Sequence, residues 1–259
     1  MRYFFILSFL TFIFLQAEVS FSGIVKPINQ IQLSVLIEGQ IEKIYFQEGS
    51  VVNKESVILS LEKSMQTLET KRKELAYLEK SKIEALKKNI AILQSLVQNK
   101  KSLYESSKAI SYNALQQNEM ELINLEGQLE TLYETKKKEK IEFEIAKEAL
   151  DNYYLKSPIN GIIVNIKPKV GEWVQRGDSI ITITDVDKCY VEIDVDFQAL
   201  QLIKFNQEVK IRFADSSKAG HIDFISPVAD NSSGLVRVKI VFDNKDRKVI
   251  PGMNAEVIF

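Results

Sequence analysis

The sequence predicts an elongated α+β chain with several domains: a β domain split into two halves, a long antiparallel helical hairpin between the halves, and a small β-barrel at the carboxyl end. Three observations support this fold class. One stretch repeats at a distance of 122 residues, with Gly39 falling on Gly161, and a proline-free run of helix formers separates the two copies. Short strands with alternating apolar residues follow the second copy.

The amino end has the pattern of an export signal. Arg2 precedes an apolar run from Tyr3 to Leu15, and the small residue Ala17 follows. The run is shorter than the ~20 residues that a bilayer-spanning helix needs. We therefore expect residues 1–17 to be a cleaved signal peptide. An uncleaved anchor is the alternative, because leucine is an unusual residue at the third position before a cut.

The repeated stretch predicts the split β domain. "GQIEKIYFQEGSVVNKESVILSLE" at residues 39–62 aligns without a gap on "GIIVNIKPKVGEWVQRGDSIITIT" at residues 161–184, and the apolar positions keep a period of two. We expect residues 31–62 and 153–184 to form one domain. The shared glycines, which we place at turns of this domain, are Gly39, Gly49, Gly161 and Gly171.

Residues 63–152 predict the hairpin, since they hold no proline and only one glycine, Gly127. Two long helices are expected, joined at the serine-rich residues 104–115, where Ser111 can cap the second helix. Arms of about 40 residues would reach roughly 60 Å.

Apolar residues at heptad spacing predict that the two arms pair as an antiparallel coiled coil. The first seam consists of Ile83, Leu86, Ile90, Leu93, Val97 and Tyr104, with Lys100 as a polar intruder. The second seam consists of Leu122, Leu125, Leu129, Leu132, Phe143, Ala146 and Leu150, interrupted by Lys136 and Glu139.

Residues 185–259 predict a small β-barrel. Segments such as "CYVEIDVD", "LVRVKIVFD" and "NAEVIF" alternate apolar and polar residues, and turn-forming residues separate them. A short amphipathic helix interrupts the strands, and Asp196 is placed to cap it.

Composition argues against nucleic-acid binding and against a catalytic or metal centre. The formal net charge is −1 and the charged residues, 27% of the chain, are mixed in sign, whereas nucleic-acid surfaces need clustered basic charge. Cys189 and His221 are single, so they cannot form a disulfide or a zinc set. We expect Cys189 to be a buried apolar residue, His221 to lie on a strand or loop, and the chain not to be an enzyme.

In this order, the elements resemble the periplasmic adaptor subunits, or membrane fusion proteins, of tripartite efflux and secretion systems (the HlyD/RND-type adaptors). The resemblance rests on the two repeat copies, on the hairpin between them and on "ISPVAD", "RVKIVFDN" and "VIPGMNAEV" in the barrel segment. It implies that the split domain is lipoyl-like, a barrel-sandwich hybrid. It also implies a periplasmic protein, associated with the inner membrane, that bridges an inner-membrane pump and a TolC-type outer-membrane channel as a hexamer or a trimer of dimers.

Two departures from the family pattern stand out. The RND-type adaptors usually carry a membrane-proximal domain built from both chain ends, and we expect that domain to be absent or reduced here. Lipoyl carriers place their modified lysine in a tight hairpin, whereas Lys63 stands where the helical insertion begins. We therefore expect no lipoyl or biotinyl cofactor.

The resemblance also places the channel contact at the hairpin tip. Ser111 matches the family's tip serine, which puts Tyr104 at the leucine position and Lys100 at the arginine position. One extra residue in this stretch would instead give the apolar role to Leu103 and leave the basic role to Lys100 or Lys101. A plain helix cap is the alternative role for Ser111. The residues expected at this contact are Lys100, Leu103, Tyr104, Ser107, Ile110, Ser111 and Leu115.

Three functions therefore compete. The first is an adaptor for an RND-type pump, and the second is an adaptor for an ABC-type exporter or a type I secretion system. The third, from another class, is a lipoyl or biotinyl carrier module of an enzyme. The sequence does not indicate the transported substrate, because an adaptor need not bind cargo in a pocket of its own.

Overall fold

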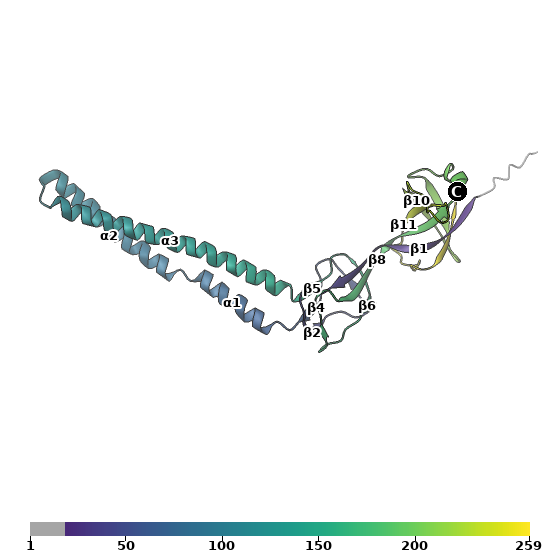
Figure 1. Ribbon diagram of the computed structural model, residues 1–259, viewed down its shortest axis with the longest axis horizontal. Helices are drawn as coiled ribbons and strands as arrows, with labels where there is room; N and C mark the ends of the chain where they lie inside the picture. The colour runs from purple at the N-terminus through teal and green to yellow at the C-terminus, as the bar shows by residue number, and fades with distance from the viewer. Residues whose placement is uncertain (1–18) are drawn as a thin grey trace, which may run out of the picture.

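The computed structural model describes residues 19–259, and the predicted signal peptide, residues 1–17, lies outside the described residues. Figure 1 shows three parts in line: a helical hairpin, a small β domain at its base, and a β-barrel at the other end. The predicted elongated α+β architecture is present.

The β domain is built from two matching halves. The first supplies β2 (Gly39–Ile44), β3 (Val51–Val52) and β4 (Val57–Leu61). At a shift of 122 residues these become β6 (Gly161–Ile166), β7 (Trp173–Val174) and the start of β8 (Ser179–Val195). The short β5 (Tyr154–Lys156) pairs with β4. The strand bounds therefore follow the sequence repeat.

The two halves complete each other across a pseudo-twofold relation. Strand β2 pairs with β7, and β3 pairs with β6. The amide of Gly49 donates to the carbonyl of Ile163 at 2.8 Å, and the equivalent amide of Gly171 donates to the carbonyl of Ile41 at 2.9 Å. Since each half satisfies backbone groups of the other, neither is expected to fold alone. The fully buried large side chains of this domain are Ile41, Ile58, Leu59, Leu61, Ile163, Ile181 and Ile183.

Only two of the four shared glycines lie in turns. Gly49 and Gly171 have φ of +85° and +90°, a region that suits glycine. Gly39 and Gly161 instead begin β2 and β6, so their predicted place in turns was wrong. At Gly161 the reason is close packing, because a Cβ there would lie 2.7 Å from the carbonyl oxygen of Thr184 on β8.

The hairpin has three helices where the sequence analysis expected two. They are α1 (Ser64–Leu78), α2 (Ser81–Ser107) and α3 (Tyr112–Asp151). The expectation of a continuous first arm was wrong, because the chain leaves helical geometry at Glu79, where ψ is 117°. The figures show α1 and α2 in succession along the single helix α3.

A repeated tetrapeptide explains the break. "LEKS" occurs at residues 61–64 and again at residues 78–81, and each copy starts a helix at its serine. In the first copy a Glu62 carboxylate oxygen accepts from the amide of Ser64 at 2.9 Å, and in the second Glu79 accepts from Ser81 at 2.6 Å. The same local hydrogen bond therefore begins α1 at the domain boundary and restarts the arm as α2.

The two arms of the hairpin run antiparallel to each other. Ile83, Ile90 and Leu93 of α2 are buried. Cross-arm contacts step forward along α2 and backward along α3: the Lys87 ammonium lies 5.7 Å from the Tyr133 ring centroid, Gln94 donates to Glu126 at 3.1 Å, and Lys100 donates to Asn118 at 2.5 Å. The polar interruption of the second seam lies opposite the helix break, where Lys136 pairs with Glu139 at 2.6 Å.

Six strands close the barrel. Their order is β1 (Ser20–Ser34), β12 (Asn254–Ile258), β9 (Glu208–Arg212), β10 (Ser217–Ile225), β11 (Val236–Asp243) and β8, and β8 pairs back with β1. The predicted range 185–259 therefore leaves out one strand, since residues 20–24 of β1 pair with β12. The helix α4 (Phe197–Leu200) is capped as expected, with the amide of Ala199 donating to Asp196 at 2.7 Å.

Two long strands join the barrel to the β domain. In β1 and β8, Ile24 pairs with Glu192 in the barrel and Ile31 pairs with Ile183 in the β domain. The predicted boundary at residues 184 and 185 thus falls inside β8. Because the same hydrogen-bonded ladder belongs to both domains, the connection is stiffer than a single-chain linker.

Candidate functional site

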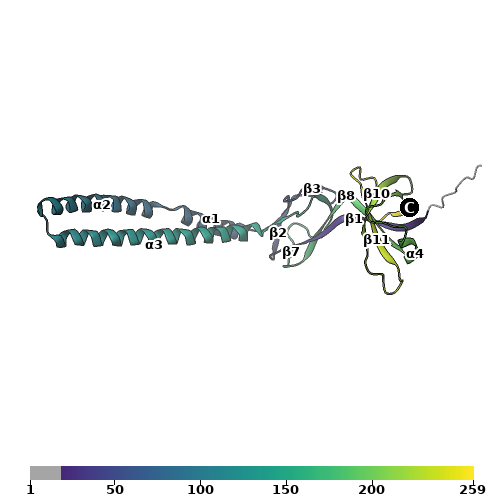
Figure 2. The ribbon, with the colours of Figure 1, turned by 90° about the horizontal axis from the view of Figure 1, so that it is seen from above.

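The hairpin tip is a tight turn at the end farthest from the barrel (Figure 2). α2 ends at Ser107, and Lys108 takes the left-handed conformation with φ of +51°, its amide donating to the Tyr104 carbonyl at 3.1 Å. α3 then starts after Ser111, whose carbonyl accepts from the amide of Leu115 at 3.3 Å. The turn predicted within residues 104–115 is present.

Ser111 occupies the N-cap position but does not cap through its side chain. Its backbone has extended geometry, with φ of −70° and ψ of 138°, yet its hydroxyl makes no capping hydrogen bond. The predicted N-cap position is therefore present without the side-chain bond that gives such a cap most of its stabilising effect. The hydroxyl lies on an exposed residue at the extremity of the hairpin.

The structure brings only some of the expected contact residues to the surface of the tip. Leu103, at 49% exposure, Ser107 and Ser111 are exposed, while Tyr104 and Ile110 are half-buried. Leu115 is buried between the arms and so supports the tip from within.

Lys100 turns inward and hydrogen-bonds Asn118 of α3, whereas its neighbour Lys101 is exposed. Tyr112, which the sequence analysis did not single out, is 56% exposed and lies with its ring centroid 5.7 Å from that of Tyr104. Its position directly after Ser111, the expected cap residue, is the sequence signal that could have identified it as a tip residue.

The base of the hairpin is fixed to the β domain by a cluster around Lys63. The Lys63 ammonium donates to a carboxylate oxygen of Glu42, and lies 5.2 Å from the Tyr154 ring centroid. The same Glu42 oxygen accepts from the Ser60 hydroxyl at 3.0 Å. The hydrogen bond from Lys63 lowers the pKa of Glu42. Desolvation acts to lower the pKa of Lys63, but the hydrogen bond to Glu42 and the charge interactions with Tyr154 and Glu42 together outweigh it, so the net shift is upward.

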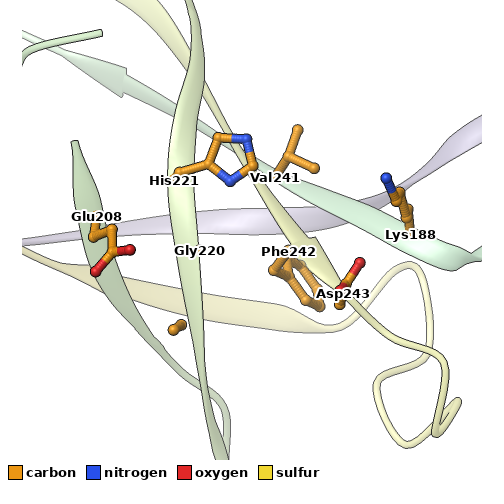
Figure 3. Close-up of a pocket in the computed structure, with 8 residues that line it drawn as sticks. Lys188, Glu208, Gly220, His221, Val241, Phe242 and Asp243 are labelled. Atoms are coloured by element: carbon orange, nitrogen blue, oxygen red, sulfur yellow. The ribbon is translucent and has the colours of Figure 1, made fainter. Parts of the chain in front are cut away.

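The barrel wall has a hollow of about 320 Å³, shown in Figure 3. Glu208 and His221 stand on the neighbouring strands β9 and β10, and Lys188 and Asp243 lie toward the far side. Within residues 19–259, no group of three or more His, Cys, Asp or Glu side chains is arranged to hold a metal ion. His221 lies on a strand, as expected.

Cys189 is a core residue of the barrel. It is fully buried, and burial raises the pKa of its thiol to about 11. The expectation of a buried, unpaired cysteine is confirmed.

Comparisons with known proteins agree with this architecture. Residues 189–259 match the family model described as the CusB-like β-barrel domain. The structure of MacA from Actinobacillus actinomycetemcomitans superposes with a TM-score of 0.76 at 21% identity, covering 93% of this chain and 78% of that one. The membrane fusion protein Spr0693 from Streptococcus pneumoniae R6 gives a TM-score of 0.62 at 15% identity, covering 92% and 97%.

The chain has the fold of a membrane fusion protein. Among curated proteins it is similar to the nodulation protein NolF of Rhizobium meliloti, with 24% identity over 91% of this chain, and to an uncharacterized protein of Haemophilus influenzae, with 24% identity over 90%. The chain spans 61% and 54% of the lengths of these two relatives. No helix in the described part of this membrane fusion fold is both long and apolar enough to cross a bilayer.

Proposed function

We propose that this chain is a non-enzymatic periplasmic adaptor that links an inner-membrane transporter to a TolC-type outer-membrane channel. The hairpin is the observation on which this rests. The 40 residues of α3, at a rise of about 1.5 Å each, extend roughly 60 Å from the β domain and end in an exposed tip. A long rod without a described catalytic centre suits a spacer, and the membrane fusion fold supports that function.

The adaptor would act in the periplasm, beside the inner membrane, after export by its amino-terminal segment. We propose that it assembles as a hexamer or a trimer of dimers in the complex. Contacts at the tip and along the β domains are individually weak, but repetition around a symmetric ring raises the effective concentration of each. Assembly is therefore expected chiefly when pump and channel are both present.

An RND-type pump is the favoured partner, since the family model that matches residues 189–259 carries the RND class in its label. An ABC-type exporter, including one of a type I secretion system, is the alternative. Affinity purification of the chemically crosslinked adaptor from membranes, followed by mass spectrometry, separates the two. A proton-driven pump in the complex supports the first partner, and an ATP-binding transporter supports the second.

The carrier alternative is disfavoured by the surroundings of Lys63. A lysine that accepts a cofactor must present its amine to a modifying enzyme, but here the ammonium is paired with Glu42 and only 16% of the Lys63 side chain is exposed. We propose that the protein carries no lipoyl or biotinyl group. Intact-mass measurement of the protein from its native cell tests this directly, and an adduct on Lys63 would overturn the adaptor function.

We propose that the channel contact is made by the exposed tip residues Leu103, Ser107 and Ser111, with Tyr112 added, while Lys100, Tyr104, Ile110 and Leu115 hold the tip in shape. An exposed serine without a capping bond suits a docking surface. Replacing it by aspartate keeps a good capping residue and adds a charge to that surface.

The substitution Ser111→Asp therefore tests the contact. We expect circular dichroism to show unchanged helicity, while recruitment of the channel and export are lost. Ser111→Ala leaves the surface neutral and is expected to retain recruitment. The matched control is Ser95→Asp on an exposed position of α2, far from the tip. Recruitment that survives Ser111→Asp would show that the docking face is misplaced.

A further inference from the structure

The barrel presents three exposed apolar side chains on one short segment. Phe197, Leu202 and Phe205 are 71%, 59% and 70% exposed. They belong to α4 and to the turns that follow it, in the short stretch between β8 and β9. Large apolar side chains gathered at an exposed site mark a surface that contacts something other than water.

This segment has a fixed shape. Between its exposed members, Ile203 is 7% exposed and packs into the barrel core. The amide of Lys204 donates to the side-chain oxygen of Gln207 at 2.9 Å, and the amide of Asn206 donates to the Ile222 carbonyl at 2.8 Å. The buried Ile203 and these hydrogen bonds fix the backbone of the segment. The exposure of the three apolar side chains is therefore a property of the folded barrel.

The segment lies at the end of the barrel where the chain enters. α4 directly follows β8, which runs antiparallel to β1, so the end of β8 stands beside the start of β1. The amide of Phe259 donates to the Val19 carbonyl at 3.0 Å, which places the last residue at this end too. Figure 2 shows α4 at the end of the molecule opposite the hairpin.

The sequence that leads into this end is apolar. The run from Tyr3 to Leu15 is separated from Val19 by only three residues. Three extended residues span at most about 10 Å. A lipid surface that holds this run would therefore lie within reach of α4 and its neighbouring turns.

We propose that Phe197, Leu202 and Phe205 insert into the headgroup region of the inner membrane in the form of the chain that keeps residues 1–17 as an uncleaved anchor, the alternative to a cleaved signal peptide. This rests on the proposed periplasmic function, which places the barrel beside that membrane. Phe and Leu side chains are common on the apolar faces of segments that lie at the headgroup boundary, and the exposed Lys204 can reach lipid phosphates while its stem lies along the apolar surface. The barrel would thus be held upright, with the hairpin directed away from the membrane.

Fluorescence quenching by brominated lipid tests the proposal on the full chain. Trp173 is the single tryptophan, so Trp173→Phe allows one reporter to be placed at will. The reporters are Phe197→Trp and Phe205→Trp. The matched control is Ile250→Trp, which is equally exposed, at 66%, on a turn where Gly252 donates to Val25, toward the β domain. Each protein is reconstituted in vesicles of phosphatidylethanolamine and phosphatidylglycerol with and without brominated chains.

We expect the Phe197→Trp and Phe205→Trp reporters to lose more than about half of their emission in brominated vesicles, and the Ile250→Trp reporter to keep it. Equal quenching at all three sites, or none, would overturn the proposal. A blue shift that grows with protein concentration and without lipid would also overturn it, because the patch would then contact a second copy. A triple variant, F197S with L202S and F205S, is expected to weaken vesicle contact but still recruit the channel. Recruitment that survives in the Ser111→Asp variant would contradict the proposed channel contact alone and does not bear on the quenching result, so the two failures are distinguishable.

Discussion

The side-chain ammonium of Lys136 lies 2.7 Å from the main-chain carbonyl oxygen of Ala76. Ala76 is two residues before the end of α1, where carbonyl groups lack a partner within the helix, and Lys136 projects from α3 across the hairpin. A cation at a helix carboxyl end also interacts favourably with the helix dipole. Lys136, which interrupts the apolar seam, thus donates a hydrogen bond to a carbonyl group that the break between α1 and α2 leaves without a partner in its own helix.

We predict that Lys136→Met destabilises the hairpin by about 1–2 kcal/mol, because it leaves the Ala76 carbonyl without its donor and Glu139 without its ion pair. Urea unfolding followed by circular dichroism measures this. The control is Lys137→Met, whose ammonium pairs only with Glu134 on its own helix and is expected to leave the midpoint unchanged. Equal midpoints for the two variants would contradict the assigned role of Lys136.

The helix break was less predictable than the repeat. Gly49 and Gly171 fix equivalent turns, so the repeat in the sequence carries over to the strands. Residues 78–81 contain no proline or glycine, so their helix propensities do not predict a break. The break is marked instead by a hydrogen bond from the Ser81 amide to the Glu79 side chain. Comparison with the other "LEKS", at residues 61–64, is the signal that would have revealed it.

Long-range pairing and side-chain direction account for the other differences. The start of β1 pairs with β12, at the far end of the chain, and the local sequence of residues 20–24 does not indicate which strand they pair with. At the tip, heptad spacing does not tell whether Lys100 extends outward or bonds Asn118, since both lie within reach of one long side chain. The exposed and inward members of the candidate contact therefore needed the structure.

The turn glycines give a second prediction. Gly49→Ala and Gly171→Ala are each expected to destabilise the β domain by about 1–2 kcal/mol, since a Cβ is strained at positive φ although the space around both is open. Gly127→Ala, in the interior of α3, is expected instead to stabilise by about 0.5–1 kcal/mol. Thermal unfolding of the three variants checks both signs. A neutral Gly171→Ala would argue against the equivalence of the two turns.

The Lys63 cluster gives a pH-dependent prediction. Because the pKa of Glu42 is lowered by folding from its ordinary 4.5, the ion pair contributes stability above that value and loses it as the pH falls through the folded pKa. We expect Glu42→Gln to cost less than about 1 kcal/mol at pH 7, since 45% of the Glu42 side chain is exposed and solvent screens the pair. Urea titrations from pH 7 to pH 3 should show the difference between the two proteins shrinking on acidification. A stability difference between the two proteins that grows at low pH would contradict the role assigned to the Lys63–Glu42 ion pair.

Cys189 gives a fourth prediction, which tests the barrel core. Its thiol is buried and its pKa is raised to about 11, so little reactive thiolate is present at neutral pH. We predict that a thiol reagent labels the folded protein only at the rate of unfolding and labels it at once in denaturant. Rapid labelling of the folded chain would mean that the barrel opens at β8.

Site-specific photo-crosslinking in the native cell tests the central claim most directly. A photoreactive residue is placed at the exposed tip positions Leu103 and Tyr112, and at Ile92 and Met65 as exposed positions lower on the hairpin. The account predicts crosslinks from both tip positions to one outer-membrane channel protein, and none to that protein from Met65 at the base. Tip positions that capture no outer-membrane protein, or a base position that captures it equally well, would contradict an adaptor whose hairpin reaches the channel.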